Sequence, residues 1–377
     1  MATSTLHAAN LFNVNGLVAV ITGGGTGIGL MMTRALALNG AAKVYIIGRR
    51  KEPLEAAASS IETGNVIPIV GDVTDKEVLA SIVSRIESEV GYINLLVANS
   101  GMAGPQATQI PTASSSLSEF TAAYGSPSVS DVVKTFELNT VAVYFSVMAF
   151  LDLLDKGNKK GNVSQTSQVI ATSSITAFNR NIPGSFIYGQ TKAATTHLMK
   201  QLSTQLVPYD IRCNTIAPGL FPSEMAAGII GSGVFPRERI PLQRVGTEEE
   251  MAGCILFLAS KAGAYCTHAL IVVDGGRINC FGAKLCIVCS FHQMRPGWTE
   301  NLEENFFPDL ADVQNKFIPT KKSLTKQIEI LTAKRMRERG GKRRRRIPNI
   351  ESAQGNAKED RGPQQYPAEA KHSANKE

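Results

Sequence analysis

The sequence predicts a doubly wound α/β fold built on a seven-stranded parallel sheet. Three observations support this prediction: short apolar runs recur through the first 276 residues, segments of helical length separate them, and a glycine-rich turn follows the first run. When strands and helices alternate in this way, each helix returns the chain to the same edge of the sheet, so the strands lie parallel and helices cover both faces.

The expected strands are short and nearly continuous in apolar residues, as buried strands are. They occupy residues 17–22, 43–47, 66–70, 93–98, 168–172, 212–216 and 269–273. The expected helices are longer and lie between these strands. They occupy residues 30–41, 52–61, 76–90, 131–154, 188–207 and 248–260.

Two segments interrupt the alternation and are expected to border a binding site. Residues 101–131 are rich in Ser, Thr, Pro and Ala with little periodicity, which predicts a long surface loop. Residues 220–242 mix apolar residues with glycines that can act as hinges, which predicts a lid. The low charge of residues 226–235 within this lid favours an apolar substrate.

Charge divides the chain into two parts. The formal net charge is +7, yet residues 1–276 hold 19 basic and 20 acidic side chains, and the remainder holds 20 and 12. All the excess positive charge therefore lies in the last quarter. We expect an α/β domain at residues 1–276, an extension of undefined structure at 277–319, and a basic, disordered tail at 320–377.

The basic run at residues 342–346 could bind nucleic acid, an anionic membrane or an import receptor. No aromatic residues interleave with it, which argues against stacking on bases. We expect a solvated tail without nucleic-acid partners, with nuclear import as the less favoured alternative. The start of the chain lacks the apolar stretch of a signal peptide, so a cytoplasmic location is expected.

Composition argues against several other classes of protein. Six cysteines are too sparse and uneven for a disulfide scaffold. The apolar run at residues 278–291 is too short to span a bilayer and contains Lys284, so no membrane span is expected. Cys280, Cys286, Cys289 and His292 could bind a metal, but no second ligand pair accompanies them, so incidental thiols are favoured and no metal is expected.

The first candidate site is the glycine-rich turn after the first strand. Glycines let the backbone turn sharply and approach a pyrophosphate, which would accept hydrogen bonds from amides at the start of the next helix. Glycine-rich strings alone are weak evidence, but a string between a strand and a helix predicts dinucleotide binding. The residues expected to contact the cofactor are Thr22, Gly23, Thr26, Gly27, Ile28 and Gly29.

The end of the second strand indicates which dinucleotide binds. Chains that bind NAD place an acidic residue about 20 residues after the glycines, where it accepts a hydrogen bond from the ribose 2′-hydroxyl. This chain has Gly48, Arg49, Arg50 and Lys51 at that place. Because a guanidinium pairs with a phosphate, the sequence predicts NADP(H) with Arg49 on the 2′-phosphate, the alternative being a solvated basic turn.

The second candidate site is the pair Tyr188 and Lys192. A spacing of four residues puts both side chains on one face of a helix. A nearby cation favours the phenolate, so we expect Lys192 to lower the pKa of Tyr188 towards the working range of an acid-base catalyst. Ser174 follows the fifth expected strand and could hold a carbonyl oxygen; Ser173 is the alternative, because neighbouring residues on a strand face opposite ways.

These residues, in this order, resemble the short-chain dehydrogenase/reductase family, which has one Rossmann-type domain. The resemblance covers residues 11–276, and the basic C-terminal tail departs from it. It implies adenine contacts at Asp72 and Val73, and it matches the family's NNAG stretch except for Ala98 and Ser100. The further cofactor positions that it implies are Asn99, Gly101, Pro218, Gly219 and Ser223, while Asp274, Gly275 and Gly276 match the usual end of the last strand.

The resemblance also implies a mechanism carried by Asn139, Ser174, Tyr188 and Lys192. In the family, nicotinamide delivers a hydride to a carbonyl carbon while tyrosine protonates the oxygen. Serine positions that oxygen, lysine binds the nicotinamide ribose and tunes the tyrosine, and asparagine holds a water of the proton relay. The spacing of Tyr188 and Lys192 indicates carbonyl rather than alkene chemistry, because enoyl reductases of the family space the two residues farther apart.

The expected function is therefore an NADP(H)-dependent oxidoreductase that interconverts a carbonyl and a secondary alcohol on an apolar or 3-oxoacyl substrate. The PGLFPSEM string at residues 218–225 is similar to fungal ketoreductases of that kind. A homodimer or homotetramer through the helices of Asn139 and Tyr188 is implied. The alternative is a non-catalytic NADP sensor or nucleic-acid-binding regulator that uses the tail. Deleting the residues beyond Gly276 would distinguish the two: an enzyme should keep its turnover, whereas a regulator should lose its partner.

Overall fold

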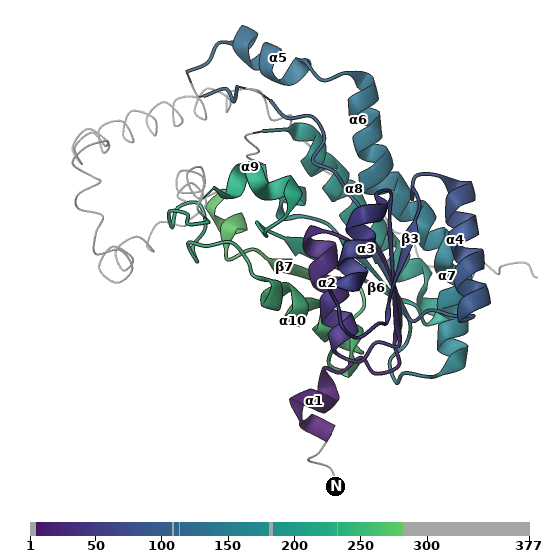
Figure 1. Cartoon of the computed structure of the whole chain (residues 1–377). Coiled ribbons are helices and arrows are strands. Elements are labelled where there is room, and N and C mark those ends of the chain that lie inside the picture. Colours follow the sequence, from purple (N-terminus) through teal and green to yellow (C-terminus); the bar gives the residue numbers. More distant parts are fainter. Residues whose placement is uncertain (1–4, 108, 113, 181–183, 232, 282–377) are drawn as a thin grey trace, which may run out of the picture. The chain divides into compact units, whose positions relative to one another are not determined.

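In the computed structural model of the chain, the described residues are 5–107, 109–112, 114–180, 184–231 and 233–281 (Figure 1). They belong to one compact unit, Met1–Gln293, and Met294–Glu377 is a second unit. The predictions for the basic tail, for most of the extension after Gly276, and for Cys286, Cys289 and His292 lie outside the described residues. The boundaries predicted between these regions stay predictions.

The predicted sheet is confirmed. Seven parallel strands pair in the order β3-β2-β1-β4-β5-β6-β7. Their bounds are β1 Val18–Thr22, β2 Lys43–Gly48, β3 Val66–Val70, β4 Leu95–Ala98, β5 Gln168–Thr172, β6 Arg212–Pro218 and β7 Leu270–Val273. Every strand predicted from the sequence is present, and β6 runs two residues beyond its predicted end.

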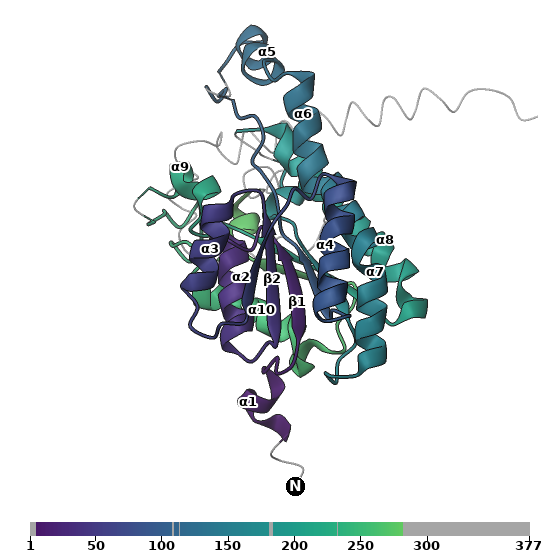
Figure 2. The same cartoon turned by 45° about the vertical axis from the view of Figure 1, so that its right-hand side comes forward.

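Alternation along the strands builds two cores. In β1, Ala19 and Ile21 belong to one buried cluster, whereas Val18 and Val20 belong to the other. Helices cover both clusters, as Figure 2 shows. Those of the first face are α2 (Gly27–Leu38), α3 (Lys51–Ser59) and α10 (Glu248–Ala259); those of the second are α4 (Lys76–Glu89), α7 (Ala142–Lys160) and α8 (Phe186–Gln205).

The strand order places the site. β1 lies between β2 and β4, so the chain moves outward in one direction through β2 and β3 and in the other through β4 to β7. Ligands of such sheets bind where the direction reverses, at the carboxyl ends of the strands. Thr22 ends β1 and Ala98 ends β4, and the residues that follow them therefore meet at this crevice.

The prediction of a long loop at residues 101–131 is wrong for its second half. The structure has helix α5 at Leu117–Gly125, and helix α6 (Val129–Phe136) begins inside the same stretch. Ser116 caps α5 in a reciprocal capping box with Glu119, and Ser128 caps α6. The serines that predicted a loop are in fact helix caps, because a serine side-chain oxygen accepts hydrogen bonds from the first free amides of a helix.

The predicted helix at residues 131–154 is also different. It consists of α6, a π-helical turn at Glu137–Val141, and α7, which continues to Lys160 and stops at Gly161 with φ of 61°. A π turn adds a residue to the helical repeat and is common at functional sites. It changes the face on which Asn139 lies, which helical spacing in the sequence does not reveal.

The remaining described elements are short. Helix α1 spans Ala8–Leu11 and helix α9 spans Ala227–Ile230. The 3₁₀ turns are Ile175–Ala177, Val207–Tyr209, Glu224–Ala226, Lys261–Gly263 and Arg277–Phe281. The predicted lid at residues 220–242 therefore contains a 3₁₀ turn and α9, and a single antiparallel bridge between Val234 and Arg244 closes its base.

One described helical stretch, Val129–Lys160, is long and apolar enough to cross a membrane by length and composition. The core helix of a globular domain passes the same test, so the stretch is weak evidence for a membrane span. Within it, Val147, Phe150 and Leu154 are completely or almost completely buried in the second core cluster.

Candidate active and cofactor site

The glycine-rich turn has a backbone that only glycine tolerates at two positions. Gly23 has φ of 68°, in the left-handed region. At Gly29 a Cβ atom would lie 2.0 Å from the carbonyl oxygen of Gly23. The turn is therefore as tight as a pyrophosphate loop requires, because the start of α2 packs directly against the end of β1.

Side chains from β1 and β4 hold this turn in place. The Thr22 Oγ1 accepts hydrogen bonds from the backbone amides of Asn99 and Ser100, both at 3.0 Å. The Asn99 Nδ2 donates to the carbonyl oxygens of Thr22 and Gly23, at 3.2 and 3.3 Å. The structure thus brings predicted residues of the two strand ends together at the switch point of the sheet.

The turn also fits an anionic ligand. Thr26, the residue before α2, makes no side-chain hydrogen bond that caps this helix. The first amides of a helix have no partner within the helix, and they carry the positive end of its dipole. A Cβ at Gly27 would lie 3.0 Å from Cβ of Ser223, so Ser223, one of the predicted cofactor positions, lies beside this helix start.

The basic turn after β2 is paired with acidic residues. Arg49 Nη1 lies 3.8 Å from Oδ2 of Asp72, so the two residues predicted for the 2′-phosphate and the adenine are neighbours. The Arg49 side chain is 69% exposed, which leaves its guanidinium open to a further ligand. Val73 is buried beside them, and Asp72 Oδ1 accepts hydrogen bonds from the amide and hydroxyl of Thr74.

Asn139 is completely buried in the π turn and is fully engaged. Its Oδ1 accepts from the amide of Met102 at 2.8 Å, and its Nδ2 donates to the carbonyl of Met102 at 2.9 Å and to the Thr191 hydroxyl at 3.0 Å. A Cβ at Gly101 would lie 3.1 Å from Asn139 Oδ1 and 3.3 Å from Lys192 Nζ. Predicted residues from three elements therefore meet at Gly101.

The structure separates the two adjacent serines. The Ser173 hydroxyl donates to the carbonyl of Lys192 at 3.0 Å and shares a 2.6 Å hydrogen bond with the Thr196 hydroxyl, so it packs against α8. The Ser174 hydroxyl instead lies near Tyr188, whose pKa it lowers, and accepts a hydrogen bond from the amide of Thr176. The choice of Ser174 as the partner of the tyrosine agrees with this arrangement.

Burial dominates the acid-base properties of Tyr188 and Lys192. It raises the pKa of Tyr188, and the neighbouring Ser174 hydroxyl lowers it by less. Burial also lowers the pKa of Lys192 to about 8. The expectation of a lowered tyrosine pKa is therefore wrong for this structure: the Lys192 ammonium, 5.8 Å from the centre of the Tyr188 ring, donates to the carbonyl of Thr172 and its charge does not offset the loss of solvation.

The end of β6 meets the end of β7. The Gly219 amide donates to the carbonyl of Val273 at 2.8 Å, and a Cβ at Gly219 would lie 2.7 Å from Cβ of Asp274. After Pro218 and Gly219, the Ser223 hydroxyl accepts from the Ala226 amide and caps a 3₁₀ turn. The chain after Pro218 thus leads the lid toward the glycine-rich turn.

Two positioning residues escaped the sequence analysis. The Thr191 hydroxyl accepts from Asn139 Nδ2 and donates to the carbonyl of Tyr188 at 2.7 Å. The Thr195 hydroxyl donates to the carbonyl of Asn139, also at 2.7 Å. The sequence shows only that both threonines follow Tyr188 on the same helix. That Asn139 lies opposite them is visible only in the tertiary structure.

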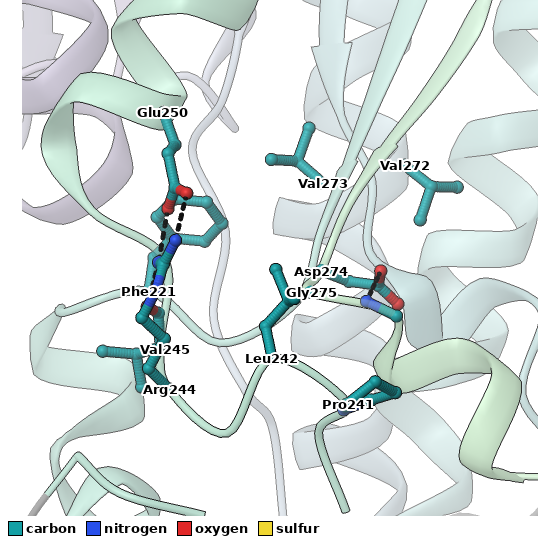
Figure 3. A pocket seen from close by; sticks show the side chains of 12 residues that line it. Phe221, Pro241, Leu242, Arg244, Val245, Glu250, Val272, Val273, Asp274 and Gly275 are labelled. Atoms are coloured by element: carbon teal, nitrogen blue, oxygen red, sulfur yellow. Dashed lines mark hydrogen bonds and ion pairs between the residues drawn. The ribbon is translucent and has the colours of Figure 1, made fainter. Parts of the chain in front are cut away.

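A cavity of about 500 Å³ lies beside the base of the lid (Figure 3). Its walls include Phe221, Leu242 and Val273, and an ion pair between Arg244 and Glu250 closes one side. None of the four predicted catalytic residues lines it. The chemistry of the site is therefore assigned from the hydrogen-bonded residues at the strand ends and not from this cavity.

Comparisons with known proteins agree with this geometry. A family described as "Enoyl-(Acyl carrier protein) reductase" matches residues 23–277. The "Short-chain dehydrogenase/reductase PhomF" of Diaporthe leptostromiformis is 53% identical over 284 residues, which cover 74% of this chain and 96% of that protein. The "Rhamnolipids biosynthesis 3-oxoacyl-[acyl-carrier-protein] reductase" of Pseudomonas aeruginosa is 29% identical over 269 residues, covering 70% and 97%.

Among solved structures, the "Pseudomonas aeruginosa RhlG/NADP active-site complex" superposes with a TM-score of 0.60 at 28% identity, covering 71% of this chain and 98% of that one. The sheet order, the glycine-rich turn, the half-buried tyrosine and the buried lysine thus occur together with the family match and with a relative that is more than half identical. The chain belongs to the short-chain dehydrogenase/reductase family of nicotinamide-dependent oxidoreductases.

Proposed function

We propose that the chain interconverts a carbonyl and a secondary alcohol with NADP(H), through Asn139, Ser174, Tyr188 and Lys192. The observation that carries the proposal is the buried contact of Ser174 with Tyr188, with Lys192 beneath the same ring. A serine hydroxyl and a protonated tyrosine that lie next to each other offer two donors to a single oxygen atom. That arrangement suits a carbonyl on which negative charge develops.

The residues divide the work between the substrate and the cofactor. A bound nicotinamide supplies or accepts the hydride. Because burial raises the pKa of Tyr188, its phenol keeps its proton at neutral pH and can protonate the carbonyl oxygen. Ser174 orients that oxygen, the Lys192 ammonium holds the cofactor ribose, and Asn139 fixes the strand end on which these groups converge.

The choice of NADP(H) rests on charge at the end of β2. No acidic residue occupies that strand end, where Gly48 is followed by Arg49 and Arg50. An acidic residue would repel a 2′-phosphate, whereas an exposed guanidinium binds it with charge-assisted hydrogen bonds. The NADP complex of the Pseudomonas aeruginosa protein supports the same choice.

The choice of carbonyl chemistry rests on the spacing of Tyr188 and Lys192. The description of the matching family names enoyl reduction, whereas the name of the Pseudomonas aeruginosa relative gives reduction of a 3-oxoacyl group. Because Lys192 follows Tyr188 by four positions on α8, the two side chains share one face of the helix, as the carbonyl-reducing members require. The proposal therefore follows the spacing and not the family description.

An apolar substrate is supported by the surroundings of α8. Phe120 and Tyr124 of α5 pack with Phe186 at the start of α8, with ring centres 4.9 Å apart within α5 and 4.8 Å apart between Tyr124 and Phe186. Phe120 and Phe186 each remain 43% exposed. Phe186 precedes Tyr188 by two residues, so this aromatic cluster offers an apolar surface next to the proposed site. A homodimer or homotetramer through α7 and α8 is part of the proposal.

The proposal is tested by NADPH oxidation with the purified full-length chain against apolar ketones, 3-oxoacyl thioesters and a 2-enoyl thioester. Turnover of the ketones or 3-oxoacyl thioesters is expected, and Tyr188→Phe should abolish it. Tyr209→Phe, which alters an exposed tyrosine, is the matched control and should keep full turnover. Turnover of the enoyl thioester alone would overturn the carbonyl assignment.

A further inference from the structure

The lid begins at a fixed point and crosses the glycine-rich turn. Phe221 is 2% exposed, so the start of the lid is anchored in the first core cluster. Two residues later, Ser223 lies against Gly27. The lid, residues 220–242, therefore passes the start of α2, where the amides that would bind a pyrophosphate are located.

A second contact ties the lid to the other side of that turn. Arg50 Nη2 donates to Glu224 at 2.9 Å to Oε2 and 3.2 Å to Oε1. Arg50 immediately precedes α3, and Leu54 of α3 would contact a Cβ at Gly25 at 3.0 Å. In both views α9, which follows Glu224, lies near the start of α3 (Figures 1 and 2).

Among the three cations of the turn after β2, Arg50 is distinctive. Lys51 pairs with Glu55 four residues later in α3, and Arg49 pairs with Asp72 after β3. Both partners belong to the same side of the cofactor site. Glu224 instead comes from the lid, so the Arg50–Glu224 pair spans the place where the dinucleotide would enter.

We infer that the Arg50–Glu224 ion pair is a clasp that closes the lid over the NADP(H) site and must open for the cofactor to bind or leave. The inference rests on the proposed cofactor site and adds a kinetic role to a residue, Glu224, that has none in the proposed reaction. The two side chains are 58% and 64% exposed, so the pair is weak enough to open repeatedly.

The clasp predicts an unusual pattern of rates. The ion pair is present before the cofactor arrives, and it can form again above the bound cofactor. It therefore changes the barrier to association and dissociation more than it changes the free energy of the free or the bound protein. Breaking it should raise the association and dissociation rates of NADPH together, by about two- to fivefold for an exposed pair, with Kd changed less than twofold.

The experiment is stopped-flow fluorescence of NADPH and NADH binding to the full chain and to Glu224→Gln. Glu238→Gln is the matched control, because Glu238 is an exposed acidic residue of the same lid and contributes the same charge. We expect faster association and dissociation for Glu224→Gln with both cofactors, and unchanged rates for Glu238→Gln. These readouts need no substrate.

Other outcomes overturn the inference. If removing the negative charge acts only through long-range attraction, NADPH should associate faster and dissociate more slowly. If Glu224 merely competes with the 2′-phosphate for Arg50, Kd should tighten for NADPH and stay the same for NADH. If the wild-type chain binds neither cofactor, the proposed function fails; if it binds NADPH and Glu224→Gln leaves both rates unchanged, only the clasp fails.

Discussion

The site has a floor of proposed catalytic residues and a basic rim, and the two are built in opposite ways. The floor, Asn139, Ser174, Tyr188 and Lys192, is mostly buried and is held by hydrogen bonds among β5, the π turn and α8. The rim, Arg49 and Arg50, is exposed and is held by single ion pairs. Burial makes the floor rigid and shifts its pKa values, whereas exposure leaves the rim able to exchange partners.

This difference predicts where substitutions act. Substitutions in the floor should affect the chemical step. Removing one buried polar atom leaves its hydrogen-bond partner unsatisfied and changes the positions of the neighbouring side chains. Changes in the rim should affect cofactor affinity and selectivity, because solvent and ions can replace a lost exposed pair.

The largest effect is expected for Tyr188→Phe, which removes one oxygen from the floor. Loss of the proton donor should lower kcat by at least about 10³-fold, within the usual range for general acid catalysis. NADPH affinity should stay within about threefold of wild type, since the ring and Lys192 remain. Steady-state kinetics and fluorescence titration measure the two quantities, and kcat within tenfold of wild type would show that the proton comes from another group.

The paired substitutions Ser174→Ala and Ser173→Ala sharpen the comparison within one strand end. Ser174→Ala should lower kcat/KM by about 10²-fold, as loss of a donor to a developing oxyanion does. Ser173→Ala should keep kcat/KM within threefold but lower the free energy of unfolding by about 1–3 kcal/mol, because it removes two buried hydrogen bonds to α8. Kinetics and urea unfolding test the pair, and the reverse pattern would exchange the two roles.

In the rim, Arg49→Ala should discriminate between cofactors. A charge-assisted hydrogen bond contributes about 1.5–3 kcal/mol, so Kd for NADPH should weaken by about 10- to 100-fold. Kd for NADH, which has no 2′-phosphate, should change less than threefold. Calorimetric titration with both cofactors checks this, and equal losses would remove Arg49 from the 2′-phosphate site.

A smaller effect is expected from pH. Burial lowers the pKa of Lys192 to about 8, so its ammonium is present below that pH and is lost as the pH rises. Carbonyl reduction needs the ammonium, so kcat/KM should fall above about pH 8, approaching tenfold per unit for one proton. A profile from pH 6 to 10 with NADPH tests the sign, and a flat profile to pH 9.5 would contradict it.

Most of the fold was predictable because its signals are local. Most strands are short and largely apolar, and the alternating positions of β1 divide between the two cores as the pleat requires. The failures occurred at α5 and at the π turn. Ser116 and Ser128 are typical loop residues by composition, but in the structure they cap helices. In the π turn, Asn139 forms hydrogen bonds with Met102 and Thr191, which are distant in the sequence.

The residues of the candidate site could also be named from the sequence, but the contacts between them could not. The glycine-rich turn, Arg49 and the spacing of Tyr188 and Lys192 are readable along the chain. The partner of Arg50 is not, because Glu224 lies 174 residues away. The direction of the Tyr188 pKa was predicted wrongly because the sequence shows a neighbouring cation and does not show how much water burial excludes.

The sequence by itself therefore determined the number of strands, the place of the dinucleotide turn and the identity of the candidate catalytic residues. The tertiary structure decided which serine faces Tyr188, how Asn139 is held, which acid closes on Arg50, and in which direction burial shifts the two pKa values. The physical reason is range: backbone turns and apolar periodicity act between near neighbours, whereas solvation and ion pairing depend on residues that only the folded chain brings together.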